Sequence, residues 1–166
     1  MIEFRPIERE ENETLETLGD EFGVDLDKAL KDKTILVGHG KRKEVFITNS
    51  ETFKQLNHMQ GEPYFAGLYI GDIKGKKFLL GLEAASIISK HSNKKVVVGQ
   101  RTEQLVLYGR DIFSKSVQGL YKKAKVGERI LIVNESNECI GIGRLKKGEV
   151  IVENVMDRGW YLRRGE

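Results

Sequence analysis

Short runs of β-branched and other apolar residues dominate the last third of the chain. The runs Ile130 to Val133, Cys139 to Leu145 and Val150 to Val152 are separated by polar or glycine-containing turns, and the run KVVV from Lys95 precedes them. Such runs are typical of short strands. Residues 95–166 are therefore predicted to form a small all-β unit with one inserted helix.

The inserted helix is expected within the segment LYGRDIFSKSV. We predict that a strand ends at Tyr108, that Gly109 makes a turn, and that a short helix begins with Arg110 and Asp111. The sequence GIGR opens like a dinucleotide fingerprint, but RLKKGEV follows where a helix should begin. We interpret these glycines as strand positions against which another backbone packs closely, with Cys139 as a small apolar residue of the same strand.

The N-terminal part mixes helical and strand patterns. Leu15, Leu18 and Phe22 recur at helical spacing after Pro6, which predicts a helix that frays or stops at Gly19 or Gly23. Further helices are predicted after Asp25 and after Ser50 as N-caps, and over the segment EAASIIS.

Strand patterns in this part come in pairs. Thr34 to Val37 and Glu44 to Ile47 alternate apolar and polar residues around the loop GHGKRK, which predicts a hairpin, and the segment YFAGLYIGDIKGKKFLLGL predicts a second one. The polar run SKHSNKK, residues 89–95, is the expected linker. We therefore predict an α+β protein with an N-terminal α/β domain over residues 1–94, whose sheet is mainly antiparallel, and a C-terminal β unit over residues 95–166.

Composition is that of an ordinary globular chain. A hydrophobic content of 39% in 166 residues is enough for cores without disulfides, and a single Cys excludes an intramolecular disulfide or a multi-thiolate metal site. No run approaches 18 apolar residues, and the start MIEFRPIEREENE is too acidic for a signal peptide. We expect a cytoplasmic protein without membrane contact; a nucleolar location, if the source is eukaryotic, is what the family resemblance described below implies.

Charge is distributed unevenly along the chain. Residues 1–94 hold 14 Lys and Arg against 16 Asp and Glu, whereas residues 95–166 hold 14 against 9. The C-terminal excess is the electrostatic pattern expected of a surface that meets a polyanion, although many inert domains match it.

Catalytic motifs were sought and none was found. His39, His58 and His91 are isolated from one another and from Cys139 in the sequence, so neither a zinc site nor a Cys/His pair is indicated. The nucleophile motif G-x-S-x-G and the phosphate loop G-x-x-x-x-G-K-[ST] are absent from the sequence. We expect no enzymatic activity and no cofactor.

Candidate phosphate-binding residues lie in or beside turns of the C-terminal part. Gly109 permits close approach of a nucleic-acid backbone, and Arg110 and Lys115 supply positive charge beside it, although Gly109 is equally consistent with a plain tight turn. Arg144 and Lys146 alternate along a strand and share a face, with Lys147 in the following turn.

Two further basic segments have competing interpretations. The terminal DRGWYLRRGE places Arg158, Arg163 and Arg164 around Trp160 and Tyr161, a pair that stacks on bases or closes a core. The loop tip at Lys41, Arg42 and Lys43 either contacts phosphate or keeps the loop solvated.

Several of these segments together resemble a known module. VLYGRDIFSKSV, GERILIVNESNECIGIGRL and DRGWYLRRG resemble a PUA domain, a small β-barrel-like RNA-binding module. FRPIEREE, LYIGDIKGKKFLL, EAASIIS and EQLVLYGRDIFSK resemble the PUA-containing large-subunit ribosome-biogenesis factors, the pre-rRNA processing family of eukaryotes and its archaeal relatives.

This resemblance implies a non-enzymatic adaptor. Its PUA domain holds pre-rRNA or rRNA through a glycine-containing strand-to-helix turn, here Gly109 and Arg110, and through the basic residues Arg144, Lys146 and Lys147 of a neighbouring strand. Its N-terminal domain docks on other ribosome-assembly proteins, and a monomer is favoured. The alternatives are an enzyme or accessory subunit of tRNA or rRNA modification, and a module whose basic face binds an acidic protein.

Overall fold

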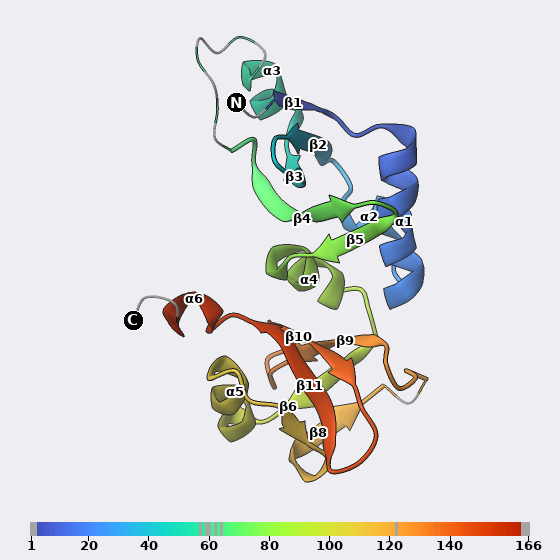
Figure 1. Ribbon diagram of the computed structural model, residues 1–166, viewed down its shortest axis with the longest axis vertical. Coiled ribbons are helices and arrows are strands. Elements are labelled where there is room, and N and C mark those ends of the chain that lie inside the picture. Colours follow the sequence, from blue (N-terminus) through green and yellow to red (C-terminus); the bar gives the residue numbers. More distant parts are fainter. Residues whose placement is uncertain are drawn as a thin grey trace. The chain divides into compact units, whose positions relative to one another are not determined.

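The computed structural model forms two compact units, Met1–Ala84 and Ala85–Glu166 (Figure 1). It describes residues 3–56, 58, 61, 63, 65–121 and 123–163, and for residues 161 and 162 the backbone alone. Each unit has its own sheet.

The first unit contains a five-stranded antiparallel sheet with the strands in chain order. The strands are β1 (Glu3–Pro6), β2 (Thr34–His39), β3 (Lys43–Thr48), β4 (Leu68–Lys74) and β5 (Lys77–Leu80). Both predicted hairpins are confirmed, although burial does not alternate along β2 and β3: consecutive residues such as Leu36 and Val37 are both fully buried. The strand β1 was not predicted, and it pairs with β2 in the register Phe4↔Gly38.

The helices of the first unit are α1 (Arg9–Phe22), α2 (Leu26–Ala29) and α3 (Ser50–Leu56), and α4 (Leu82–Ser89) crosses into the second unit. Helix α1 is confirmed, with Leu15, Leu18 and Phe22 buried at 2% exposure each. It ends at Gly23, whose φ of 65° is left-handed, whereas Gly19 lies inside the helix. Pro6 does not start it, since Pro6 lies in β1.

Side-chain caps begin two of these helices. The side chain of Asp25 accepts a hydrogen bond from the backbone N–H of Lys28, as predicted for α2. For α3 the cap is Asn49 rather than Ser50, because Asn49 Oδ1 accepts from the backbone N–H of Thr52 at 2.7 Å. Both residue types are good N-caps, so the sequence alone did not separate them.

The second unit contains a near-closed barrel made from a six-stranded sheet in the order β7-β11-β10-β9-β6-β8. The strands are β6 (Lys95–Val98), β7 (Ile112–Phe113), β8 (Val117–Leu120), β9 (Arg129–Val133), β10 (Cys139–Leu145) and β11 (Val150–Asp157). All pairs are antiparallel except β6 with β9. The α+β architecture and the C-terminal barrel are thus confirmed.

The helical part of the second unit differs from the prediction. Helix α5 (Gln100–Leu107) precedes the turn at Gly109, and the two-residue strand β7 and the 3-10 turn η1 (Ser114–Ser116) follow it. The expected strand before Tyr108 and helix after Arg110 are therefore wrong. The consecutive apolar residues Leu105, Val106 and Leu107 do not distinguish a helix from a strand, and Val106 alone of the three is fully buried.

The glycines of β10 occupy the close contacts that the sequence indicated. A Cβ at Gly141 would meet the backbone oxygen of Met156 at 2.8 Å, and one at Gly143 would meet Val152 Cγ1 at 2.2 Å.

The segment expected to be a linker, residues 89–95, contains packed residues. Ser92 and Lys94 are buried, and Lys94 Nζ lies 2.9 Å from Glu128. A polar run is therefore used as packed structure here.

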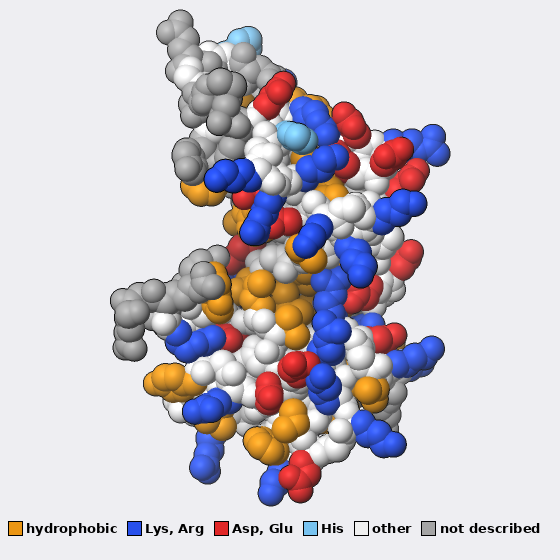
Figure 2. All heavy atoms as spheres, viewed as in Figure 1, with side chains coloured by type: hydrophobic (Ala, Val, Ile, Leu, Met, Phe, Trp, Pro, Cys, Tyr) orange, Lys and Arg blue, Asp and Glu red, His pale blue; other side chains and the backbone are white. Residues whose placement is uncertain are grey.

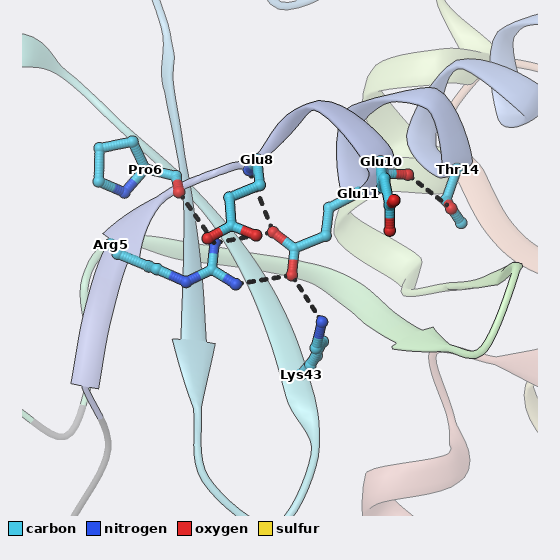
Figure 3. A network of polar contacts seen from close by, with 7 residues as sticks. All are labelled: Arg5, Pro6, Glu8, Glu10, Glu11, Thr14 and Lys43. Atoms are coloured by element: carbon cyan, nitrogen blue, oxygen red, sulfur yellow. Dashed lines mark hydrogen bonds and ion pairs between the residues drawn. The ribbon is translucent and has the colours of Figure 1, made fainter.

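A buried carboxylate holds α1 against the sheet of the first unit (Figure 3). Glu11 is 4% exposed, and its oxygens accept hydrogen bonds from Arg5 of β1 at 2.7 and 2.8 Å and from Lys43 of β3 at 2.9 Å. It also accepts from the backbone N–H of Glu8, which completes a capping box. The hydrogen bonds from Arg5, followed by those from Lys43 and Glu8, lower the pKa of Glu11 from 4.5 to about 2.

We expect the Glu11→Gln variant to unfold more easily by about 3 kcal/mol at pH 7, since each pKa unit corresponds to about 1.4 kcal/mol. The folded-state pKa lies below its ordinary value, so this stabilisation is complete above pH 4.5 and is lost as the pH falls through 2. The difference from the parent protein should thus shrink to about half at pH 3. Urea unfolding followed by circular dichroism measures it.

Glu13→Gln is the matched control. Glu13 lies on the same helix but pairs with the exposed Arg9, whose side chain is 93% accessible. Its loss should cost less than about 0.5 kcal/mol. A pH-independent difference for Glu11→Gln would contradict the assigned role of the charge.

Candidate nucleic-acid interface

The turn at Gly109 is a helix C-terminus. Gly109 has a φ of 79°, its N–H donates to Val106 O at 2.8 Å, and the N–H of Arg110 donates to Leu105 O at 2.9 Å. These two bonds form a Schellman motif, which favours glycine at this position. No helix begins at Arg110, and the N–H groups of Gly109 and Arg110 are both engaged in closing α5.

Strand β11 holds this turn in place. The backbone N–H of Asn154 donates to Asp111 Oδ1 at 2.8 Å. The side-chain amide of Asn154 donates to Val106 O at 2.9 Å and to Arg110 O at 3.3 Å. One residue of β11 thus binds both the end of α5 and the segment that leads into β7.

An ion pair covers the inner side of the same turn. Arg163, in the short helix α6 (Trp160–Arg163), donates from both terminal nitrogens to Asp157 at 2.9 Å each, and it also donates to Leu107 O. Asp157 is 2% exposed, and the hydrogen bond to it raises the pKa of Arg163. A Cβ at Gly109 would meet Arg163 Nη2 at 3.1 Å. The guanidinium therefore occupies the space beside Gly109.

The outer side of the turn presents an aromatic ring and a cation. Tyr108 is 72% exposed, Arg110 is exposed, and Phe113 in β7 is 46% exposed. Among the residues that the structure describes, no carboxylate forms an ion pair with Arg110. Tyr108 is predicted from the sequence to end a strand, whereas in the structure it is the C-cap residue of α5. Its position beside a helix-capping glycine is the signal that marks it as exposed.

The second basic group lies on β10 and in the turn that follows it. Arg144 is exposed and lies opposite Glu153 of β11 on one side and Arg129 of β9 on the other. Lys146 Nζ lies 2.8 Å from Glu153, and this hydrogen bond, with the charge of Arg144 contributing less, lowers the pKa of Glu153. Lys147 is exposed in the turn. Figure 2 shows Lys and Arg side chains gathered over this part of the sheet.

The two groups belong to strands on the two sides of β11. Leu145, Val152 and Ile112 form one row over the strands β10, β11 and β7. Arg144 and Glu153 belong to the adjacent row on β10 and β11, and Asp111, which precedes Ile112, lies on the same side of the first row. With strands spaced about 4.8 Å apart, the backbones of β10 and β7 are about 10 Å from each other. By this register Arg144 lies toward the side of Arg110, whereas Lys146 and Lys147 follow Leu145 in the opposite direction along β10.

The remaining residues predicted to bind RNA lie at other places in the unit or are hydrogen-bonded within it. Lys115, in η1, lines a pocket with Gln100 and Arg101 at the opposite end of α5 from Gly109. Arg158 Nε donates to Cys139 O at 2.8 Å, and its Nη2 donates to Ser86 Oγ. Arg164 and the side chain of Tyr161 lie outside the described residues. Base stacking by Trp160 and Tyr161 therefore stays a prediction.

The described residues provide neither a metal cluster nor a membrane-spanning helix. Within the described ranges, no group of three or more His, Cys, Asp and Glu residues is placed to hold a metal ion. In those ranges, too, no helix has the length and apolar character needed to cross a bilayer.

Two family models match consecutive parts of the chain. The model described as NIP7/UPF0113, pre-PUA domain, matches residues 4–82, and the model described as UPF0113 PUA domain matches residues 94–166. The fold and these matches define a two-domain protein with a C-terminal PUA domain. The chain belongs to the NIP7/UPF0113 family.

Relatives and solved structures agree with this assignment. The chain is 34% identical over 141 residues to a UPF0113 protein of Archaeoglobus fulgidus, which covers 78% of each sequence. It is 30% identical over 137 residues to a UPF0113 protein of Aeropyrum pernix, which covers 80% of this chain and 75% of the relative.

Solved structures are similar in fold at low identity. A conserved PUA domain protein from Thermoplasma acidophilum has a TM-score of 0.64 at 13% identity, with 98% of this chain and 99% of that chain covered. A hypothetical protein from Pyrococcus horikoshii has a TM-score of 0.60 at 15% identity, with coverage of 96% and 99%. These two similarities support the two-unit fold.

We expect Gly109→Ala to destabilise the second unit more than Gly127→Ala does. Both glycines have positive φ, 79° and 91°, so both substitutions carry a backbone cost of about 1 to 2 kcal/mol. A Cβ at Gly127 has nothing within 4 Å, whereas one at Gly109 meets the anchored guanidinium of Arg163. Thermal unfolding measures the difference. Equal losses of stability in the two variants would show that the Arg163 side chain moves aside without a loss of stability.

Proposed function

We propose that this protein is a non-enzymatic RNA-binding adaptor whose PUA domain holds RNA by its phosphates at the junction of α5, β7, β10 and β11. One observation carries the proposal: in a unit matched by a PUA family model, Arg110 and Lys147 stand exposed on the two sides of β11 without an ion-pair partner among the described residues. Cations that are not neutralised by the protein are available to displace the counterions of a nucleic acid.

The basic side chains of the proposed interface differ in whether a carboxylate of the protein already binds them. Arg110, Arg144 and Lys147 are exposed and form the principal phosphate contacts of the proposal. Lys146 contributes less, because Glu153 already binds it. Lys115 lies at the far end of α5 and would contact a longer RNA.

Arg158 and Arg163 have a different role in this proposal. Arg163 is bound by Asp157 and Arg158 by the carbonyl of Cys139, so both position the segment that carries the interface. The second-unit charge of 14 Lys and Arg against 9 acids over residues 95–166 remains available as a long-range attraction for RNA.

Tyr108 adds a contact that does not depend on charge. Its ring is 72% exposed next to Arg110, and an exposed ring stacks on unpaired bases of any sequence. A single-stranded segment that has its phosphates on Arg110 therefore has a base within reach of Tyr108. The proposed ligand is consequently single-stranded or locally unpaired RNA.

The cellular role in this proposal is assembly of the large ribosomal subunit, with pre-rRNA or rRNA on the PUA domain and other assembly proteins on the N-terminal unit. It is supported by the resemblance of the chain to the ribosome-biogenesis factors and by its membership of the NIP7/UPF0113 family. Crosslinking the protein to RNA in cells and sequencing the attached RNA tests it. Reads dominated by tRNA rather than rRNA would favour a role in tRNA modification.

Replacing Arg110, Arg144 and Lys147 with Ala should weaken single-stranded RNA binding for all sequences alike. Each lost phosphate contact should reduce the slope of log affinity against log salt by roughly 0.7. The control removes three exposed cations from other parts of the same unit, Arg101, Lys123 and Lys125. Fluorescence anisotropy over a salt series should then separate the two variants. Equal losses of affinity in the two triple variants would show that RNA binding depends on net charge alone.

Tyr108→Ala should weaken binding without changing the salt slope, because a stacked base contributes about 1 to 3 kcal/mol and releases no counterion. The Tyr108→Phe variant keeps the ring and should bind like the parent protein. A loss in Tyr108→Phe equal to that in Tyr108→Ala would transfer the effect to the hydroxyl group.

A further inference from the structure

The first unit contains a cationic pocket of about 610 Å³ between its two hairpin turns. We name it the hairpin pocket, and it is lined by His39, Gly40, Lys41, Arg42, Lys43, Asp72, Ile73, Lys74, Gly75 and Leu79. No function described above uses it.

Strand register brings the two turns together. Lys43, at the start of β3, pairs with Ile73 near the end of β4. Because the two strands are antiparallel, the turn before β3 and the turn after β4 lie at the same end of the sheet. Residues 33 positions apart in sequence, Lys41 and Lys74, therefore line one pocket.

The concentration of charge there is unusual for this unit. Residues 1–84 contain 12 Lys and Arg against 16 Asp and Glu, an acidic balance overall. Half of those cations nevertheless lie in or next to the two turns: Lys41, Arg42, Lys43, Lys74, Lys76 and Lys77. Figure 2 shows Lys and Arg side chains on the visible face of this unit over its strands.

Two acids neutralise part of this charge. Glu11 binds Lys43 at 2.9 Å, and Asp72, which also accepts a hydrogen bond from the hydroxyl of Tyr69 at 2.9 Å, lies 3.6 Å from Arg42. Arg42 keeps 76% of its side chain exposed. Lys41 and Lys74 are exposed, and no described carboxylate pairs with either of them.

From this arrangement we infer that the hairpin pocket is a second RNA-binding site, which takes the phosphodiester backbone on Lys41, Arg42 and Lys74. Asp72 orients the Arg42 fork toward the pocket, while Lys41 and Lys74 act as point charges on either side of it. Gly40 and Gly75 leave the backbone of both turns bare, and a Cβ at Gly75 would have nothing within 4 Å. Phosphate oxygens can therefore approach the main chain.

The lining favours a nucleic acid over an acidic protein segment. Of the ten lining residues, all of them described, Leu79 is the one large apolar side chain that is well exposed, at 46%. Protein interfaces depend on apolar or aromatic anchors at their centre, whereas nucleic-acid interfaces are predominantly cationic. The choice of RNA rests on the proposed function, while the anion site itself does not.

The full chain carrying Lys41→Ala and Lys74→Ala tests this site. Against single-stranded oligouridylate, we expect about tenfold weaker binding at low salt and a log–log salt slope reduced by roughly 1.4, for two lost contacts. Lys28→Ala with Lys31→Ala is the matched control, since it removes two exposed lysines from the same unit outside the pocket. The control should bind like the parent protein.

Three outcomes decide the matter. Unchanged affinity and slope in the Lys41 and Lys74 variant would overturn the site. Loss of polyglutamate binding with RNA binding intact would also overturn it, in favour of an acidic protein. If the variant of Arg110, Arg144 and Lys147 keeps its RNA affinity while the hairpin-pocket variant loses it, the PUA proposal fails and this inference stands.

Discussion

The pairing of β11 with β10 on one side and with β7 on the other is the constraint on which the second unit depends. It buries Val152 completely in the core, and the same strand carries the half-buried Glu153 and Asn154 and the buried Asp157. Glu153 binds Lys146, the amide of Asn154 binds the end of α5, and Asp157 binds Arg163. One strand therefore supplies both the closure of the barrel and the supports of the candidate interface. Any change that shifts its register moves every one of these contacts together.

Buried carboxylates sort the basic residues of this protein into two kinds. Glu11, Asp72 and Asp157 are each less than 10% exposed, and each is bound to at least one cation. Burial of an unpaired charge is costly, so their partners are held in place as part of the fold. Cations without such a partner, such as Lys41 and Arg110, remain free to meet a ligand. A count of Lys and Arg cannot make this distinction, and it decides where a polyanion binds.

Several elements were predictable for local reasons. The hairpins of the first unit follow from apolar runs separated by short polar turns, and α1 follows from the spacing of Leu15, Leu18 and Phe22. The order of α5 and β7 was predicted incorrectly because three consecutive apolar residues fit either structure. Strand β1 was missed because its burial pattern is weak and its pairing partner is more than 30 residues away. In each failure the deciding information lay in a distant part of the chain.

By itself the sequence determined two units, an antiparallel sheet in the first, short strands in the second and a positive balance over residues 95–166. The tertiary structure alone decided which cations are neutralised, since Lys43 binds Glu11 across 32 positions of the chain. It also decided how the turn at Gly109 is held, since the Asn154 amide donates to the Arg110 carbonyl across 44 positions. The physical reason is the range of the interactions. Periodicity and propensity act between near neighbours along the chain, whereas ion pairs and hydrogen bonds of side chains depend on which strands the core packing has brought together.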